Sequence, residues 1–194
     1  MELAHTRWEK SLLNSLNLKN NALSRISKIA DFKTRKMIAG GLIMSTVSYI
    51  IQVYGSCSGY LLQALQVQQN FAARYTCKLP FFTPTQTLLN QCGWLSIRQL
   101  VAYHSLILLH KVIVNKTPQY IYSRLKFNER DSRTSDNMML VENRRYKTAT
   151  ASRSFLPRTI KDWNKLPIDI RSTENHVFFK KQVKIFIKDN IPIK

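Results

Sequence analysis

The segment SIRQLVAYHSLILLHKVIVN, from Ser96 to Asn115, decides the fold class of this 194-residue chain. Ser96 offers a side-chain oxygen to the free N–H groups of a first turn, so the pattern predicts a helix over Ile97–Asn115. Apolar residues such as Leu100 and Leu106 surround its central turns. A helix that is hydrophobic nearly all round is typical of the middle of a helical domain. We therefore expect a mainly α protein with this helix at its centre.

Helical periodicity continues on both sides of this segment. Apolar residues recur at helical spacing, and oxygen-bearing side chains stand where helices can begin. The predicted helices cover Leu3 to Ile29 (as one or two helices), Arg35 to about Tyr54, Leu61 to Thr76, Pro84 to Asn90, Pro118 to Leu125, a segment beginning near Pro157, and Val177 to Ile187. Asp31 or Thr34 is expected to cap the second of these helices, and Thr173 or Asn175 the last.

The composition changes near Asn128. From there to Ser154 the chain is rich in Arg, Ser, Thr and Asn and has few apolar residues. This pattern predicts a loop with at most a weak hairpin, around Met138–Val141 and Tyr146–Thr148. We expect a helical domain over 1–127, a basic loop or weak hairpin over 128–154, and a C-terminal helical segment over 155–194.

Charge is the strongest compositional signal. The chain has 30 Lys+Arg against 11 Asp+Glu, which gives a formal net charge of +19. Such a charge favours partners that carry phosphate, either nucleic acid or an anionic membrane face. Between Asp31 and Glu129 there is no carboxylate at all. Half of the chain therefore cannot supply the paired acids that two-metal or general acid–base catalysis requires, and we expect no enzymatic activity.

The cysteines argue against a metal site. Cys57, Cys77 and Cys92 form no C-x-x-C pair, and no His stands at finger spacing. We therefore expect neither a bound metal nor a cofactor. An odd, sparse cysteine count is typical of reduced, buried thiols in a nuclear or cytoplasmic protein. The first residues show no basic region followed by an apolar one, so we expect a protein that is not secreted.

A membrane anchor over residues 37–54 is an alternative interpretation. This stretch has 18 residues and no charge, and about 20 apolar residues cross a bilayer. The small or polar side chains fall on one stripe: Gly41, Ser45, Ser48 and Gln52. Such a stripe favours a helix buried in a soluble core with a close-packed small face, but it also suits a membrane helix interface. The alternative of a single-span or membrane-surface protein stays open.

The stretch TRKMIAGGLIMSTVSYIIQVYGSCSGYLLQALQVQQNFAARY, from Thr34 to Tyr75, resembles part of the LINE-type non-LTR retrotransposon reverse transcriptases. It is similar to the region just downstream of their polymerase palm. There, a helix with S-x-x-x-Y precedes Y-G or W-G, and a second helix carries L-Q-x-x-Q-N-x-A-x-R. The matching residues are Ser45, Tyr49, Tyr54, Gly55, Leu65, Gln66, Gln69, Asn70, Ala72 and Arg74.

Further matches follow in the order of the family. QCGWLSIRQL resembles the family's G-x-L-x-I segment, and TPQYI resembles the P-x-Y-L that follows it. RSFLPRTIKDWNKLPIDIR, from Arg153 to Arg171, resembles the signature R-S-F-x₇-W-N-x-L-P-x-x-I-R. With FKKQVKIFI, the similarity spans about 160 residues, from Lys33 to Lys194.

The resemblance implies a multi-helix, thumb-like bundle from the thumb and post-thumb region. The family's Tyr-x-Asp-Asp turn, whose aspartates hold the catalytic metal ions, has no counterpart here. We therefore expect a non-catalytic fragment of an RNA-directed DNA polymerase. Its implied partners are nucleic acid, as RNA–DNA hybrid or duplex, and the palm domain of a parent enzyme, with no small-molecule substrate.

In the parent enzyme, the resemblance implies helices that hold template–primer phosphates without reading bases. Lys and Arg suit this task because each phosphate contact releases condensed counterions. The candidate phosphate-binding residues are Lys33, Arg35, Lys36, Arg133, Arg144, Arg145, Lys147, Arg153 and Arg158. Tyr146 and Phe155 lie among them and are candidates for stacking on an unpaired base or sugar.

Other polar and aromatic residues have structural interpretations. Trp163 and Trp94 are expected to pack in the core. His104 and His110 lie six residues apart on an apolar helix, off any shared-face spacing, which argues against a ligand pair. The glutamines of the Leu61–Thr76 helix suit either minor-groove contacts or, as the ordinary case, an exposed helix flank: Gln63, Gln66, Gln68 and Gln69.

Overall fold

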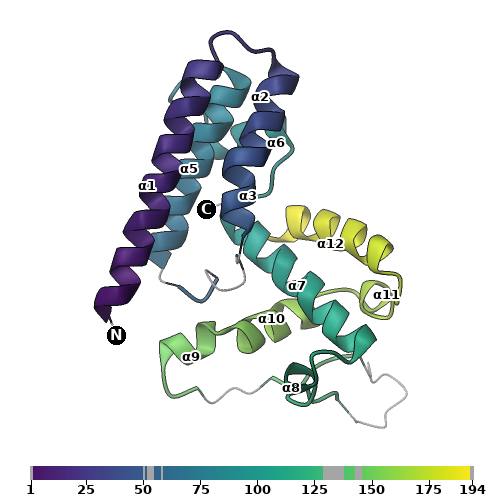
Figure 1. The fold of residues 1–194 in the computed structure, drawn as a ribbon. Coiled ribbons are helices and arrows are strands. Elements are labelled where there is room, and N and C mark those ends of the chain that lie inside the picture. The colour runs from purple at the N-terminus through teal and green to yellow at the C-terminus, as the bar shows by residue number, and fades with distance from the viewer. Residues whose placement is uncertain are drawn as a thin grey trace. The chain divides into compact units, whose positions relative to one another are not determined.

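The computed structural model describes residues 2–49, 51, 55–57, 59–128, 138–142 and 146–192. These residues are mainly helical (Figure 1), which confirms the expected fold class. In chain order the elements are α1 (Glu2–Ile26), α2 (Phe32–Ala39), the π-helix η1 (Gly40–Met44), α3 (Ser45–Ser48), α5 (Gly59–Cys77), α6 (Thr85–Cys92), α7 (Ile97–Asn115), α8 (Gln119–Tyr122), α9 (Ala149–Arg153), α10 (Phe155–Asn164), α11 (Ile168–Arg171) and α12 (His176–Asn190).

The chain folds as two compact units. Unit 1 comprises residues 1–51 and 57–100, and unit 2 comprises residues 52–56 and 101–192. Their boundary falls inside α7, whereas the sequence predicted a helical domain that ends at residue 127. The physical reason is that α7 residues from Ala102 onward share one core with residues of α10 and α12. Composition alone does not reveal that pairing, because the partners lie some 50 to 80 residues further along the chain.

Unit 1 is organised around α5, which packs against α1, α2 and α6. Figure 1 shows α1 and α5 side by side along much of their length. Leu16 and Leu23 of α1 and Leu61 and Leu65 of α5 are buried. Each pair lies at a spacing that keeps its members on one helix face, so the 3.6-residue periodicity located this core correctly.

The glutamines of α5 correct a prediction. Gln68 and Gln69 are only 8% and 0% exposed, so this part of the cluster is neither an exposed flank nor a groove-reading surface. Gln69 Nε2 donates to the Leu95 carbonyl at 2.8 Å, and Asn20 Nδ2 donates to Gln68 Oε1 at 2.9 Å. Buried amides need such partners, because an unmade hydrogen bond costs more than a made one gains. These glutamines join elements of unit 1.

The chain from α2 to α3 also corrects a prediction. Ala39, Ile43 and Val47 are completely buried and lie at four-residue intervals. Gly41 and Ser45 are exposed, and a Cβ built on Gly41 would meet nothing within 4 Å. Gly41 and Ser45 of the small stripe therefore lie on an open face, so the expected close-packed small face is wrong at these two positions; Gln52 lies outside the described residues. The apolar side packs instead because Ile and Val bury more apolar area than Gly and Ser.

Side chains begin three helices as the sequence predicted. Ser96 and Gln99 form a reciprocal cap at the start of α7. The Ser96 hydroxyl accepts from the Gln99 amide at 3.3 Å, and Gln99 Oε1 accepts from the Ser96 amide at 3.0 Å. This arrangement satisfies two N–H groups that the helix leaves without partners. Asp31 caps α2 and Asn175 caps α12 by the same kind of bond.

Unit 2 has an aromatic core. Trp163 and Phe179 are completely buried, with ring centroids 5.9 Å apart. Apolar residues of α7, α10 and α12 surround them, including Leu106 and Ile187. The prediction that Trp163 is a core anchor is confirmed. Trp94, in unit 1, is half-buried and packs against a small cluster around Leu88, in agreement with the expected packing role.

The described parts of the predicted basic loop, residues 138–142 and 146–154, fold differently from the prediction. Leu140 pairs with Phe127 in an antiparallel bridge, with bonds from the Asn128 amide to the Met139 carbonyl at 2.9 Å and from the Val141 amide to the Lys126 carbonyl at 2.8 Å. The expected pairing around Tyr146–Thr148 is therefore wrong. Thr148 instead caps the short helix α9, which the sequence left as loop. Leu140 pairs with Phe127 and not with residues 146–148, because Phe127 also packs against the unit 2 core.

Among the described residues, α7 is the one helix with the length and apolarity of a membrane span, with a mean hydropathy of 1.3. Of that window, 56% is buried within the protein, as expected for a central helix. The alternative anchor over 37–54 includes residues 50 and 52–54, which lie outside the described residues, and it stays a prediction.

Candidate nucleic-acid interface

The predicted basic residues of unit 1 separate into two kinds. Lys33 and Lys36 of α2 are exposed, as a phosphate contact requires. Arg35 is 6% exposed, and its Nε donates to the Thr76 carbonyl at 2.8 Å while Nη1 donates to the Ala30 carbonyl at 2.6 Å. Its guanidinium thus joins α2 to the end of α5. Arg35 does not lie on the surface where the sequence prediction put it.

The predicted residues of unit 2 also differ in exposure. Lys147 and Arg153 are exposed beside α9. Arg158 of α10 is half-buried, and its Nη2 donates to the Ser105 hydroxyl at 3.3 Å. Arg158 therefore has a structural role in addition to any contact with a ligand. The remaining predicted residues lie outside the described part of the chain: Arg133, Arg144 and Arg145.

A cavity of about 760 Å³ lies in unit 2. It combines three aromatic rings, several aliphatic side chains, two cations and one carboxylate. The lining residues are Tyr120, Ile121, Arg124, Lys126, Val141, Glu142, Tyr146, Ser154, Phe155, Leu156, Pro157 and Ile160. Tyr120 is 68% exposed, and Arg124 and Lys126 are exposed, so the cations and one ring are open to solvent. The structure thus brings the predicted stacking residues Tyr146 and Phe155 to one site.

Four segments build the cavity. Helix α8 and the chain after it supply Tyr120 and Arg124, and the first turn of α10 supplies Phe155. The wall formed by residues 138–142 is held by α10. Trp163 Nε1 donates to the Met138 carbonyl at 2.9 Å, and Asn164 exchanges two bonds with the Leu140 backbone, at 2.8 and 3.0 Å. The W-N pair therefore fixes this wall.

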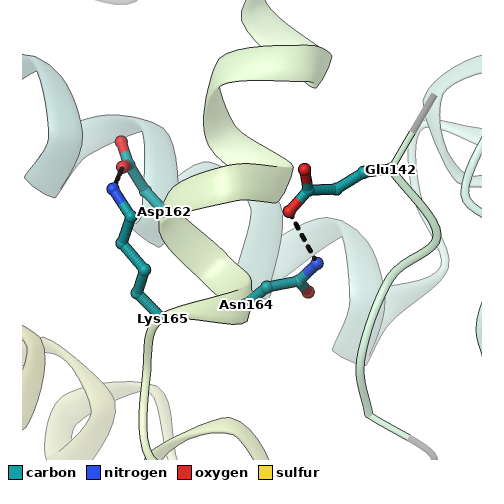
Figure 2. Close-up of polar contacts among 4 residues, drawn as sticks. All are labelled: Glu142, Asp162, Asn164 and Lys165. Atoms are coloured by element: carbon teal, nitrogen blue, oxygen red, sulfur yellow. Dashed lines mark hydrogen bonds and ion pairs between the residues drawn. The ribbon is translucent and has the colours of Figure 1, made fainter. Parts of the chain in front are cut away.

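The cavity carboxylate, Glu142, is held by the same Asn164. Figure 2 shows the Asn164 amide directed at Glu142, with Nδ2 donating to Oε1 at 3.3 Å. The second carboxylate in this view, Asp162, pairs with Lys165 at 3.4 Å. Burial raises the pKa of Asp162, and the neighbouring Lys165 charge partly offsets that rise. The two acids have separate partners and do not form a catalytic pair.

A smaller hollow of about 260 Å³ in unit 1 also combines rings and cations. Arg74 lies 5.1 Å from the ring centroid of Phe81 and 5.9 Å from that of Phe71, and its Nε donates to the Phe81 carbonyl at 3.0 Å. This guanidinium is held by contacts within unit 1, and the exposed Lys78 also lines the hollow, whereas two exposed cations, Arg124 and Lys126, line the larger cavity. We therefore take the unit 2 cavity as the candidate site.

The histidines form a structural pair and not the pair considered from the sequence. His110 Nε2 lies 2.7 Å from the Thr173 carbonyl, so that nitrogen carries a proton, and Nδ1 lies 3.3 Å from His176 Nδ1. In the neutral pair, His176 Nδ1 is then the donor. Burial lowers the pKa of His110, and desolvation followed by the charge of Lys180 lowers that of His176. Both rings are therefore suited to the neutral form.

Sequence reasoning missed four aromatic or charged residues of the site: Tyr120, Arg124, Lys126 and Glu142. Tyr120, Arg124 and Lys126 lie in and just after a predicted short helix, whereas the predicted basic cluster lies further along the chain, between residues 133 and 158. The bridge between Phe127 and Leu140, together with the packing of Leu125 in the unit 2 core, holds this stretch at the cavity that Tyr146 and Phe155 also line. The available signal was the alternation of cationic and apolar residues over 124–127, which is weak over so few positions.

The arrangement suits binding and offers no reactive constellation among the described residues. No group of three or more His, Cys, Asp or Glu side chains there is placed to hold a metal ion. The thiol pKa of Cys92 is raised by burial, and the nearby Cys77 thiol, at 3.2 Å, raises it further. A buried thiol of high pKa is a poor nucleophile, because the thiolate is the reactive form.

Comparisons with protein-family models, with curated proteins and with solved structures give no match to this chain.

Proposed function

We propose that the chain is a non-catalytic fragment of a retrotransposon reverse transcriptase, from the thumb and post-thumb region, that binds template–primer nucleic acid through phosphate contacts. One observation carries this proposal. Arg124 and Lys126 stand exposed at a ring-lined cavity of unit 2. The motifs that resemble the LINE-type enzymes support the origin of the fragment, and the cavity supports the type of ligand.

The balance of charge supports a phosphate-bearing ligand in both units. Unit 1 contains eleven Lys/Arg and three acidic residues, and unit 2 contains nineteen and eight. Cations in such excess cannot all be neutralised within the protein. Exposed lysines and arginines attract polyanions without regard to sequence, and their binding weakens steeply as salt rises.

The non-catalytic part of the proposal is supported by what the acids do. Glu142 accepts from Asn164, and Asp162 pairs with Lys165. Phosphoryl transfer by two metal ions needs carboxylates that converge on one point. The stretch most similar to the polymerase family, from Thr34 to Tyr75, contains no carboxylate.

A salt titration tests the proposal. Anisotropy of a fluorescent RNA–DNA hybrid reports binding to the full chain at potassium chloride concentrations between about 50 and 200 mM. If about four cations contact phosphates, affinity falls roughly 100-fold over this range. A morpholino duplex of the same sequence, which lacks phosphate charges, is the matched control and is expected not to bind. Binding that is absent, or equal at both salt concentrations, would overturn the proposal.

A further inference from the structure

We propose that the unit 2 cavity receives one unpaired nucleobase, with a preference for bases that present N–H donors, guanine above all. This inference rests on the proposed function and specifies which part of the nucleic acid enters the site. The observation behind it is that three rings, two cations and one carboxylate line a single cavity of about 760 Å³.

The size and lining of the cavity suit a nucleotide. Sites for small molecules and cofactors commonly measure 300–1,000 Å³ and combine apolar walls with a few polar groups. Here the walls are aliphatic and aromatic, with Ile121, Leu156 and Ile160 among them. Bulk phosphate alone would not need such walls, because a charged, hydrated group gains nothing from apolar surface. The apolar part of the cavity therefore fits the flat face of a base.

The rings supply the stacking surfaces. Tyr120, Tyr146 and Phe155 come from three different segments, yet all line the cavity. Stacking on aromatic side chains is the usual way in which proteins hold the bases of single strands. A paired base in a duplex cannot enter, because its faces are covered by its neighbours and its edge by its partner. The cavity therefore selects a base at an overhang, a frayed end or a single strand.

The two cations complete the nucleotide-binding site. Arg124 and Lys126 are exposed, so they meet the phosphate that follows or precedes a base held by the rings. This division of work, with rings on the base and cations on the backbone, is typical of single-strand binding. It places stacking and charge neutralisation within one nucleotide.

Glu142 gives the site a base preference. Its Oε1 accepts from Asn164, and the carboxylate retains lone pairs that can accept further donors. Guanine presents two adjacent N–H donors on its Watson–Crick edge, adenine and cytosine present one amino group each, and the edge of uracil is mostly acceptor. A fixed carboxylate therefore favours guanine, accepts adenine and cytosine less well, and rejects uracil.

The test compares ends of one hybrid. Anisotropy is measured for the full chain with a blunt RNA–DNA hybrid and with the same hybrid carrying a four-nucleotide RNA overhang of G, A, C or U. We expect the G overhang to tighten binding roughly 5- to 100-fold over the blunt hybrid, the range that one stacked base provides. The U overhang is expected to give the smallest gain.

Variants assign the effect to the cavity. Tyr120→Leu with Tyr146→Leu is expected to remove the gain that the overhang gives over the blunt hybrid, measured as the ratio of the two affinities for the same variant. Tyr60→Leu is the matched control, since Tyr60 is a 76% exposed ring in unit 1. Glu142→Gln removes the negative charge at constant shape and is expected to reduce the ratio of G to U affinity toward one. Circular dichroism melts of each variant check that the fold is intact.

The outcomes separate this inference from the proposed function. If blunt and overhang hybrids bind equally, or if the cavity variants lose no more than Tyr60→Leu, the cavity inference is overturned and phosphate binding stands. If neither hybrid binds, the proposed function falls, and the inference falls with it. If Glu142→Gln leaves the order of affinities for the G, A, C and U overhangs unchanged, the role assigned to the carboxylate is overturned.

Discussion

Unit 1 and unit 2 are both helical and both have apolar cores, but the largest buried side chains that link their elements differ in kind. In unit 1, buried polar side chains join the elements, as when Gln69 binds the Leu95 carbonyl and Arg35 binds the Thr76 carbonyl. In unit 2, aromatic side chains do so, with Trp163 packed against Phe179. The type of a polar residue in a basic protein therefore does not show whether the residue binds a ligand. Its role depends on whether its side chain is buried among other elements, as that of Arg35 is, or exposed, as that of Arg124 is.

The same difference decides where a ligand can bind. In unit 1, hydrogen bonds to backbone carbonyls hold the guanidinium groups of Arg35 and Arg74, while Lys33 and Lys36 are exposed on α2. The aromatic core of unit 2 instead fixes a loop wall through Trp163 and Asn164, which leaves Arg124 and Lys126 exposed at a cavity.

The largest effect is expected from Trp163→Ala. The side chain is completely buried and donates to the Met138 carbonyl at 2.9 Å. Removing a buried Trp typically costs about 3–5 kcal/mol of unfolding free energy. Urea unfolding followed by circular dichroism measures the loss. Hydrogen exchange should show protection lost in α10 and α12 but kept in α1 and α5, and a uniform loss across both units would contradict the contrast.

Arg35→Ala is expected to cost about 1.5–3 kcal/mol, because it removes two charge-assisted hydrogen bonds to carbonyls. The variant should leave the salt dependence of nucleic-acid binding unchanged, since this cation is not on the surface. Lys33→Ala, on an exposed neighbour, is the matched control and should leave stability unchanged. If Arg35→Ala keeps full stability but weakens binding, the structural role assigned to Arg35 is wrong.

Alanine at two glycines should have opposite effects. A Cβ on Gly55 in unit 2 would collide with the Arg158 guanidinium and the Val101 side chain, so Gly55→Ala should cost about 1–3 kcal/mol. Gly41 in unit 1 has open space around it, and helical Gly→Ala changes typically stabilise by about 0.5–1 kcal/mol. Thermal unfolding of the two variants measures both signs. Equal effects would show that the packing around Gly55 is not as described.

The smallest effect is a pH dependence of unit 2. The pKa values of His110 and His176 are lowered in the fold, the first chiefly by burial, and burial also lowers that of His104. The unfolded chain takes up protons below about pH 6.5 while the fold resists them, so stability is greatest above that pH and falls with acidification. Urea midpoints at pH 7.5 and 5.5 measure the fall. His110→Gln should reduce it, and an unchanged pH dependence would contradict the neutral pair.

Most of the fold could be predicted because helices are local. The start of α7 follows from Ser96, and the bounds of α5 and α12 follow from apolar spacing within one or two turns. The π-helix at Gly40–Met44 could not be predicted, because its apolar spacing differs little from that of an ordinary helix. The bridge between Phe127 and Leu140 could not be predicted either. It depends on Trp163, more than 20 residues further along the chain, which binds the Met138 carbonyl next to the bridge.

The candidate site was predictable only in part. Tyr146 and Phe155 stand among basic residues in the sequence, which marked them as stacking candidates, and both line the cavity. The place of Arg124 and Lys126 at the cavity could not be predicted, because it depends on contacts with residues far along the chain, such as the bridge between Phe127 and Leu140. Arg35 was wrongly predicted to be exposed. Helical spacing shows which residues share one face of a helix, but not how closely another helix covers that face.

The salt dependence of binding by Arg124→Gln with Lys126→Gln shows whether phosphates bind at the unit 2 cavity. Each lost phosphate contact makes the negative slope of log K against log salt less steep by about 0.9. The slope of the double variant should therefore be less steep by about 1.8. Lys184→Gln with Lys188→Gln, on exposed positions of α12, is the matched control and should keep the slope of the unmodified chain. A slope for Arg124→Gln with Lys126→Gln equal to that of the unmodified chain would contradict phosphate binding at the unit 2 cavity.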